Sequence, residues 1–292
     1  MRIGIHTSTA GALERAALKA AELGANTFQI FSASPRMWRT KPPDSAQVAE
    51  MKRLRAELDL TPLVIHDSYL INLAAVDPVI REKSIAAFRG EIERALTIGA
   101  EYLVAHPGSY KGQTIDQAID MLVEALAEAA QGLESDRFML LLENTAGAGA
   151  ALGSRFEELK QIRDLAKDRI GFGIGYCLDT CHCYAAGYDV SVPEGLRDTV
   201  RQADEILGLE NVPVIHTNDS KGALGSRLDR HAHIGEGQIG EEGFRRILTH
   251  PKLKTKAFIL ETPIDNEGDD LRNVETLKRL CRKSRTTTTK SN

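Results

Sequence analysis

Imidazole and carboxylate side chains stand at nine positions of this 292-residue chain where they could bind metal ions. Six of them close short apolar runs: His66, His106, Glu143, Asp179, His216 and Glu261. Three more follow two of these runs, in the segments CLDTCH and SRLDRHAHIGEG: His182, Asp229 and His231. Such groups repel and desolvate one another when crowded together, at a cost on the order of several kcal/mol, and divalent cations remove that cost. Mixed histidine and carboxylate ligation favours Zn²⁺, Mn²⁺ or Fe²⁺ over Mg²⁺ or Ca²⁺.

Nine donors are too many for one tetrahedral ion and fit two or three ions that share a bridging carboxylate. Glu143 is central in the order of the apolar runs, so we expect it to be the bridge. His182, Asp229 and His231 together are expected to hold an additional ion. Ions held in this way generate hydroxide near neutral pH, which is the chemistry of a hydrolase.

Apolar runs of strand length alternate with amphipathic segments of helix length along the whole chain. The expected strands are Arg2–His6, Thr27–Phe31, Leu63–His66, Tyr102–His106, Phe138–Glu143, Ile174–Asp179, Val214–His216 and Phe258–Glu261. The segments between them repeat apolar residues at spacings of three and four, as one buried helix face requires, and Gly24 and Gly99 stand where helices should end. Eight strands, each followed by a helix, predict a (β/α)₈ TIM barrel, with an open doubly wound sheet as the alternative. In such a barrel the ligand candidates gather at the C-terminal mouth, because all the strands are parallel.

The composition is that of an ordinary folded domain. Hydrophobic residues make up 42% and charged residues 27% of the chain, so we expect one catalytic barrel over residues 1–284 and a disordered polar tail over 285–292. No apolar run approaches the ~20 residues that a membrane-spanning helix needs. The N-terminus has the pattern of a strand and not of a signal peptide, so we expect a cytoplasmic protein. The ordinary surface composition favours a monomer.

Cysteines and the remaining histidines receive other interpretations. Three cysteines crowd around His182, too close together for a disulfide framework: Cys177, Cys181 and Cys183. A small structural zinc site is the alternative there, but the CxxC pairs of a zinc ribbon are missing, so buried thiols are favoured. His233 could support the ligands from behind or lie in a solvated loop, and His250 is expected to end a helix. The sequence does not decide the roles of His6 and Trp38.

The chain resembles the endonuclease IV family of abasic-site (AP) endonucleases along nearly its whole length, from GIHTSTAGALERAA to FILETP. The most specific stretches are HDSYLINL (66–73), HPGS (106–109), LENTAG (142–147), CLDTCHCYAAGYD (177–189), HTNDSK (216–221), SRLDRHAHIGEGQIG (226–240) and LETP (260–263). Three features depart from the family pattern: Gly11-Ala12 replaces a pair of glycines, Thr217 replaces an aliphatic residue, and Ala232-His233 replaces a His-Ser pair. None of these departures removes a candidate ligand.

The resemblance implies a centre of three zinc ions, or one with Mn²⁺ or Fe²⁺ at one or more of its sites. The implied ligands are His66, His106 and Glu143 for the first ion, Glu143, Asp179, His216 and Glu261 for the second, and His182, Asp229 and His231 for the third. The implied reaction is hydrolysis of the phosphodiester 5′ to an abasic site in duplex DNA, leaving a 3′-hydroxyl and a 5′-deoxyribose phosphate, together with trimming of 3′ ends. Glu261 and Glu143 are the expected catalytic carboxylates, with Glu261 orienting or deprotonating the attacking water.

The resemblance also implies contacts to duplex DNA. Arg36, Tyr69 and Leu70 are expected to enter the duplex beside an extruded abasic sugar; packing of Tyr69 and Leu70 against the barrel is the alternative. Basic residues in strand-to-helix loops are candidates for phosphate contacts: Arg36, Lys41, Lys221, Arg227 and Arg230. The formal net charge of −4 argues against a nucleic-acid partner, but three divalent ions would reverse its sign and concentrate positive charge at the mouth.

Two other functions are compatible with such a barrel. A sugar isomerase or epimerase also places histidines and carboxylates around one or two divalent ions at the mouth, but it would need no third group such as His182, Asp229 and His231. A non-catalytic damage-binding protein could keep the fold, but it would be expected to have lost some of the nine ligands.

Overall fold

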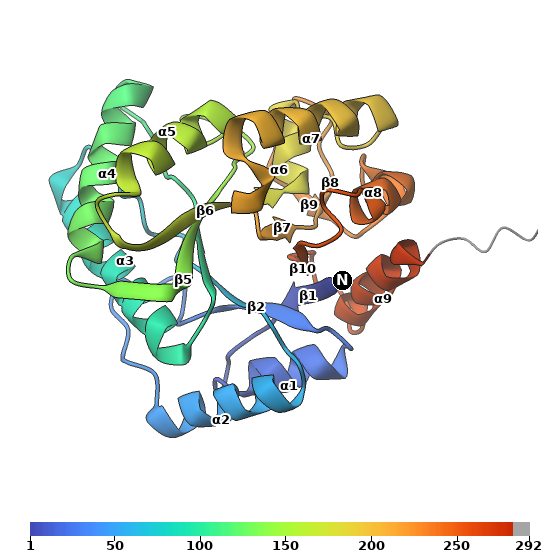
Figure 1. The fold of residues 1–292 in the computed structure, drawn as a ribbon, viewed down its shortest axis with the longest axis horizontal. Helices are drawn as coiled ribbons and strands as arrows, with labels where there is room; N and C mark the ends of the chain where they lie inside the picture. The colour runs from blue at the N-terminus through green and yellow to red at the C-terminus, as the bar shows by residue number, and fades with distance from the viewer. Residues whose placement is uncertain (283–292) are drawn as a thin grey trace, which may run out of the picture.

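The computed structural model describes residues 1–282, which form a closed barrel of parallel strands surrounded by helices (Figure 1). The barrel strands are β1 (Arg2–His6), β2 (Thr27–Phe31), β3 (Leu63–His66), β4 (Tyr102–Ala105), β5 (Glu134–Glu143), β6 (Gly171–Asp179), β7 (Val214–His216) and β10 (Ala257–Leu260). Their order around the barrel follows the chain, and β10 closes it by pairing with β1. The predicted TIM barrel is confirmed, and the open sheet is excluded.

The helices are α1 (Arg15–Glu22), α2 (Ser45–Glu57), α3 (Pro78–Ile98), α4 (Ile115–Ala130), α5 (Phe156–Ala166), α6 (Thr180–Ala186), α7 (Pro193–Leu207), α8 (Gly240–Thr249) and α9 (Asp269–Cys281), with a 3₁₀ turn, η1, at Leu209–Asn211. Four of the α-helices in the described residues, α2, α3, α4 and α6, begin at a residue whose side chain accepts a hydrogen bond from the first turn. The carboxylate of Asp77 caps the first turn of α3, and Gly99 ends this helix in the left-handed conformation, as predicted. A reciprocal capping box of Thr114 and Gln117 begins α4.

Apolar side chains fill the barrel interior below the mouth. This inner layer consists of Val64, Val104, Leu141, Cys177, Val214, Ala257 and Ile259. Alternate residues of a strand point to the same face, so the side chain two residues further along each strand also points inward, one level nearer the mouth. Those positions hold His66, His106, Glu143, Asp179, His216 and Glu261. The strand pleat therefore brings the six strand-end candidates into one ring, although β4 and β10 end one residue earlier than predicted.

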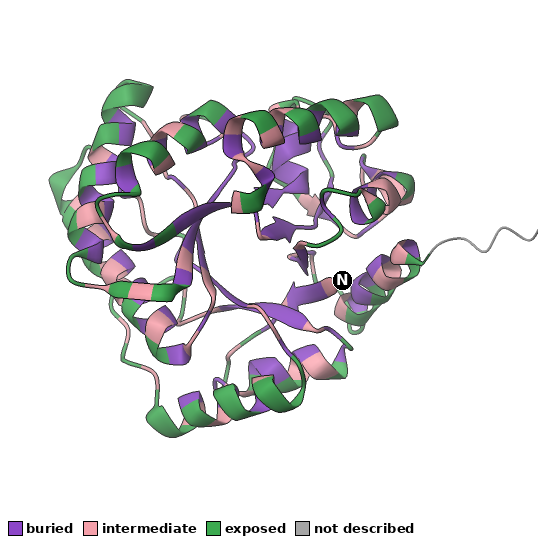
Figure 2. Ribbon diagram, viewed as in Figure 1, coloured by how far each residue is buried: buried purple, intermediate pink, exposed green. Residues whose placement is uncertain are grey.

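The larger part of the core lies between the barrel and its helices, whose outward faces are exposed (Figure 2). Phe28, Phe88, Phe156 and Phe244 are fully buried in this layer. Within residues 1–282, none of the helices combines the length and the apolar character needed to cross a membrane. The predicted domain end at residue 284 and the predicted tail, 285–292, lie outside the described residues.

A two-stranded sheet that the sequence did not predict follows β7 and shapes the next loop. Its strands, β8 (Asp219–Ser220) and β9 (His231–Ala232), are antiparallel and pair Ser220 with His231. The buried carboxylate of Asp219 accepts hydrogen bonds from five backbone N–H groups: those of Ser220, Gly235, Gly237, Ile239 and Gly240. A Cβ atom at position 237 would lie 2.5 Å from Asp219 Oδ1, so only glycine lets the backbone approach this closely.

The Asp219 carboxylate predicts a stability test. In Asp219→Asn, an NH₂ group would face backbone N–H groups whose hydrogen bonds the carboxylate now accepts. We therefore expect the free energy of unfolding to fall by about 3 kcal/mol. Urea unfolding followed by circular dichroism measures this change. Asp198→Asn, at an exposed side chain of α7, is the matched control and should stay within about 0.5 kcal/mol of wild type. Equal stability of the two variants would contradict the role assigned to Asp219.

Candidate metal centre

The structure brings the nine candidate ligands together in three groups at the barrel mouth. Within each group the potential ligand atoms all lie within 4.8 Å of one another. The groups are His66, His106 and Glu143; Glu143, Asp179, His216 and Glu261; and His182, Asp229 and His231. Glu143 belongs to two of them and is fully buried. These groups have the same membership as the three ligand sets that the family resemblance implied.

The first group is built on the ends of β3, β4 and β5. The Nε2 atoms of His66 and His106 lie 3.2 Å and 3.7 Å from Glu143 Oε2. His66 Nδ1 lies 3.0 Å from the carbonyl oxygen of Asp67, which can only accept a hydrogen bond. The proton of a neutral His66 ring is therefore on Nδ1, and its Nε2 lone pair points at Glu143.

The second group joins the ends of β5, β6, β7 and β10. His216 Nδ1 lies 3.1 Å from Glu143 Oε1 and 3.2 Å from Glu261 Oε2. The amide of Asn218 donates to Asp179 Oδ2 over 2.6 Å, and its Oδ1 accepts the backbone N–H of Glu261. Asn218 thus ties the strand ends that carry Asp179 and Glu261 to each other.

The third group lies nearer the surface, on α6 and the loop that contains β9. Asp179 Oδ1 accepts the backbone N–H of His182, which starts α6 and directs the His182 ring into the mouth. His182 Nε2 lies 3.2 Å and His231 Nε2 lies 3.6 Å from Asp229 Oδ1. The Nδ1 atoms of both rings face backbone carbonyls, of Asn144 for His182 and of Glu261 for His231. Asp229 is the exposed member of the group.

The histidine ring orientations fit a metal centre. His66, His182 and His231 each place Nδ1 on a carbonyl oxygen and turn Nε2 toward a carboxylate. This is the arrangement that holds metal-binding imidazoles in one tautomer. Within the described chain, His231 Nε2 is buried without a hydrogen-bond partner. A lone pair that faces only anionic oxygens is unfavourable unless a proton or a cation lies between them, so this donor set suits divalent ions.

The charges within the cluster also suit divalent ions. Burial opposes ionisation of Glu143, yet contacts with His216 and His106 hold its pKa well below the ordinary value. The pKa of Glu261 is lowered to about 2 against burial, chiefly by His216. Burial would lower the pKa of His66, but its hydrogen bond to Glu143 raises it to about 9. The carboxylates are therefore anions that need compensating positive charge, which protons or divalent cations can supply.

The cysteines do not form a site of their own. Burial raises the pKa of the Cys177 and Cys181 thiols to about 12, as the favoured interpretation of buried thiols expects. Among the potential metal-binding groups of the described residues, Cys181 occurs once, with Asp179 and His231, and neither Cys177 nor Cys183 occurs. The small structural zinc site considered from the sequence is therefore not formed.

Histidines outside the three groups serve local structure. His250 caps the C-terminus of α8, as predicted. His233 Nδ1 lies 3.0 Å from the amide nitrogen of Asn273 in α9, and its Nε2 faces Asp265 and Asp269. His233 therefore anchors α9 and does not support the ligands from behind. His6 is half-buried, desolvation lowers its pKa to about 4, and its ring faces the amide nitrogen of Gln29.

The predicted DNA-contacting residues surround the mouth. Tyr69 is 69% exposed, Leu70 is half-buried, and the Tyr69 ring rests edge-on against Phe31. Packing against the barrel, the alternative considered from the sequence, thus holds only in part for both residues. Ser68 donates a hydrogen bond to the carbonyl oxygen of Pro35, which joins this loop to the one that carries Arg36. The predicted basic residues are all exposed: Arg36, Lys41, Lys221, Arg227 and Arg230.

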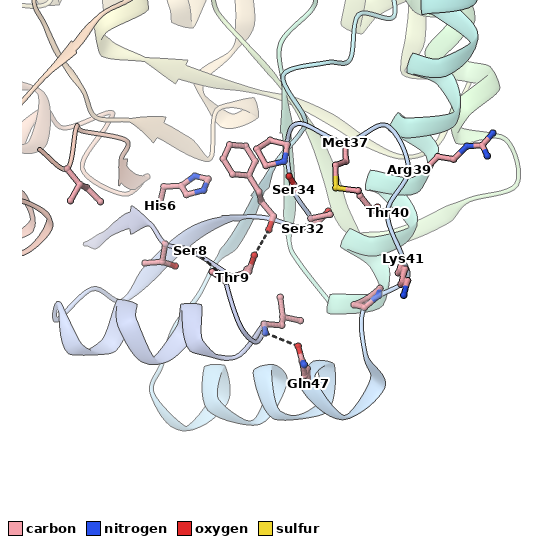
Figure 3. A pocket seen from close by; sticks show the side chains of 18 residues that line it. His6, Ser8, Thr9, Ser32, Ser34, Met37, Arg39, Thr40, Lys41 and Gln47 are labelled. Atoms are coloured by element: carbon pink, nitrogen blue, oxygen red, sulfur yellow. Dashed lines mark hydrogen bonds between the residues drawn. The ribbon is translucent and has the colours of Figure 1, made fainter.

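A groove of about 1070 Å³ lies beside the centre, between the loops that follow β1 and β2 (Figure 3). Its walls combine apolar side chains such as Phe31 with hydroxyl groups and two cations, Arg39 and Lys41. Thr9 Oγ1 donates a hydrogen bond to the carbonyl oxygen of Phe31 and links the two loops. The groove is therefore a recess of mixed polarity next to His6.

Sequence reasoning missed three buried amides that hold the ligands. Gln29 and Asn218 donate to ligand carboxylates, and Asn144 Oδ1 accepts the backbone N–H of Asp179. Asn144 and Asn218 each lie one or two residues after a predicted ligand, so the motifs that contain them offered a signal. Gln29 stands alone as an amide within the apolar strand TFQIF, which was the available signal for a buried polar role.

Comparison with known proteins agrees with this fold. The chain matches the family model described as xylose isomerase-like TIM barrel over residues 17–283, so by class it is a barrel of that family. A protein of Solibacter usitatus named probable endonuclease 4 is 59% identical over 281 residues, which cover 96% of this chain and 97% of that protein. The crystal structure of endonuclease IV from Thermus thermophilus superposes with a TM-score of 0.83 at 42% identity, covering 96% of this chain and 98% of that one. The chain therefore belongs to the endonuclease IV family of abasic-site endonucleases.

The barrel alone does not separate this family from sugar epimerases. A D-tagatose 3-epimerase-like protein superposes with a TM-score of 0.70 at 21% identity, covering 96% of this chain and 97% of that one. This likeness shows the fold only.

The shared carboxylate predicts how zinc affects stability. If the groups hold zinc, Zn²⁺ at a concentration about 100 times its Kd would raise the free energy of unfolding by about 2.7 kcal/mol per site, because a ligand that binds only the folded state stabilises it. Glu143→Gln weakens two of the three groups, so most of this gain should disappear. Thermal unfolding with zinc and with excess chelator measures it, and Glu205→Gln on exposed α7 is the control. A zinc shift that is the same in both variants would refute a ligand role for Glu143.

Proposed function

We propose that this endonuclease hydrolyses the phosphodiester 5′ to an abasic site in duplex DNA, leaving a 3′-hydroxyl and a 5′-deoxyribose phosphate, and that it also trims blocked 3′ ends. The proposed cofactor is three zinc ions, with Mn²⁺ or Fe²⁺ able to replace zinc at one or more sites, and one copy of the chain suffices. The observation that carries the proposal is the convergence of nine ligand candidates into three groups linked through Glu143, in a chain whose relative is a probable endonuclease 4.

The three groups supply the ligands. His66, His106 and Glu143 would hold one ion, and His182, Asp229 and His231 another. The remaining ion would be held by the second group, which consists of Glu143, Asp179, His216 and Glu261. Divalent ions in such a centre supply a nucleophile at neutral pH and neutralise charge on the reacting phosphate and on the leaving oxygen. Glu143, which belongs to two of the groups, would serve as a ligand for two of the ions.

Glu261 is proposed to orient the attacking water. Its Oε1 accepts a hydrogen bond from Gln29 over 2.6 Å, and its Oε2 faces His216 and the amide of Asn218. These contacts hold the carboxylate in a fixed place at the mouth, where it would orient or deprotonate the attacking water.

The mouth offers the chemistry that a duplex with a missing base requires. Tyr69 presents an exposed ring, and Leu70 and Arg36 lie on loops that the Ser68 hydrogen bond holds together. Such residues can fill the space left by an extruded sugar, and extrusion costs least where stacking is already lost.

Exposed cations are available for the phosphate backbone. Within residues 1–282, Arg36, Arg227 and Arg230 make no ion pair within 4.0 Å, so they are free to contact phosphate. Arg39 and Lys41 add positive charge to the groove beside the centre. These contacts would anchor DNA without reading its sequence.

The third group of ligands favours this function over a sugar epimerase. One or two ions suffice to isomerise a sugar, whereas His182, Asp229 and His231 form a separate group at the exposed side of the mouth. Three ions suit a reaction with a nucleophile, a charged phosphate and a leaving oxygen to stabilise. Retention of all nine donors also argues against a protein that only binds damaged DNA.

The proposal is tested with a labelled duplex that carries one tetrahydrofuran abasic analogue, which cannot undergo β-elimination. We expect a single cut 5′ to the analogue, lost after prolonged chelation and restored by Zn²⁺ or Mn²⁺. Denaturing gels resolve the product, and an undamaged duplex is the control substrate. Retardation of the abasic duplex without any cut, under every metal condition, would show a binding protein instead of a nuclease.

Tyr69→Ala tests the recognition of the missing base. Loss of an aromatic stack is worth about 1–3 kcal/mol, so kcat/KM on the abasic duplex should fall by about 10- to 100-fold. The zinc content and the thermal midpoint should not change, because Tyr69 is exposed and outside the three groups. Leu18→Ala, at a 49% exposed residue of α1, is the control. Unchanged kcat/KM in Tyr69→Ala would exclude this residue from DNA recognition.

A further inference from the structure

Gln29 is a fully buried amide in the middle of β2, and its side chain contacts two of the metal-binding residues. Its neighbours in the barrel are Val64 of β3 and His6 of β1. Phe28 and Ile30, on either side of it, point to the opposite face and pack in the core between barrel and helices. A buried amide costs free energy unless all its donors and acceptors are satisfied, so its contacts indicate what it does.

The three contacts of Gln29 fix which way its amide is turned. Its Nε2 lies 2.6 Å from Glu261 Oε1 and 3.1 Å from His6 Nδ1. Its Oε1 lies 2.8 Å from His216 Nε2. An ionised carboxylate can only accept hydrogen bonds, so the amide nitrogen must face Glu261, and the amide oxygen is then left for His216. The reversed amide would set an oxygen against the carboxylate.

This orientation decides where His216 carries its proton. The amide oxygen of Gln29 accepts a hydrogen bond, so His216 must donate from Nε2, and Nδ1 keeps the lone pair. His216 Nδ1 is the atom that lies 3.1 Å from Glu143 Oε1 and 3.2 Å from Glu261 Oε2. Gln29 also occupies Glu261 Oε1, which leaves Oε2 as the carboxylate oxygen on the side of the group.

We propose that Gln29 is a positioning residue for the second metal-binding group: it sets the tautomer of His216 and holds Glu261 so that His216 Nδ1 and Glu261 Oε2 are presented together as ligand atoms. The inference rests on the proposed zinc-dependent function. Gln29 touches neither the groove cations nor Tyr69, and it acts on the reaction through these two ligands alone. The Nδ1 atom of His6 accepts a hydrogen bond from the second hydrogen of the Gln29 amide, so both donors of the amide have a partner. His6 also lines the groove.

The test compares two nearly isosteric variants of the full chain. Gln29→Met removes both the donor and the acceptor, so His216 loses its fixed tautomer and Glu261 loses its partner. Gln29→Glu keeps an acceptor for His216 but cannot donate to Glu261 when ionised. Gln113→Met is the control, because the Gln113 amide donates one hydrogen bond to the carbonyl oxygen of Ala74 and neither residue belongs to the three groups.

Zinc titration of metal-free protein against a chromophoric chelator is the first readout. In Gln29→Met we expect one of three zinc equivalents to bind about 10- to 100-fold more weakly, and the other two to bind as in wild type. Long-range ¹H–¹⁵N spectra of the histidine rings are the second readout. They should show His216 protonated on Nε2 in wild type and in Gln29→Glu, and lose this signature in Gln29→Met. On abasic duplex, kcat should fall at least tenfold while KM stays unchanged.

The outcomes separate this inference from the function on which it rests. If wild type binds no zinc, the proposed function fails and the inference fails with it. If wild type binds three equivalents and both Gln29 variants do the same, only the inference is overturned. A uniform loss of all three equivalents would show a merely structural role and would also overturn it. Should Gln29→Met not fold, the expected weakening of one equivalent in Gln29→Glu, with the His216 tautomer retained, carries the test.

Discussion

The buried carboxylate of Glu143 is the constraint on which the rest of the mouth depends. A histidine from each of the three groups lies within 3.2 Å of it: His66 at Oε2, and His216 and His182 at Oε1. A fully buried anion is tolerated only where positive charge surrounds it. The ring of imidazoles around Glu143 meets that need, and the hydrogen bond of Glu143 to His66 raises the pKa of His66 to about 9. Divalent ions would satisfy the same need and at the same time provide the chemistry.

The scaffold meets this constraint through simple geometry. An apolar layer fills the barrel, and the pleat places the next inward position of six strands at the mouth. Loops add what the strands cannot reach: α6 carries His182 directly after Asp179, and the β8–β9 sheet sets His231. Asp219 fixes the segment that follows β9 by accepting hydrogen bonds from five backbone N–H groups. The strand ends and the hydrogen-bonded loop thus place all the candidate ligands close together at the mouth.

The sequence predicted the architecture and the ligand candidates because both follow from local rules. Strand and helix periodicity indicated eight repeats, and the barrel is the result. His66, His106 and His216 each stand two residues after a buried apolar residue of the same strand, a pattern visible in the chain itself. The basic residues of the loops could also be named from the sequence. Their exposure could not be predicted, because loops lack the regular residue spacing that indicates burial in strands and helices.

The sequence by itself determined the barrel, the nine candidate donors and the common end of the molecule for the six at strand ends, since parallel strands leave no other place for residues at their C-terminal ends. The division of the nine donors into three sets was implied by the family resemblance. Only the tertiary structure decided the ring orientations, the partnership of Gln29 with His216 and Glu261, and the turn of His233 toward α9. These depend on hydrogen bonds between residues far apart in the chain. The distances between such atoms depend on how the strands close into the barrel, so they cannot be predicted from the local spacing of residues in the sequence.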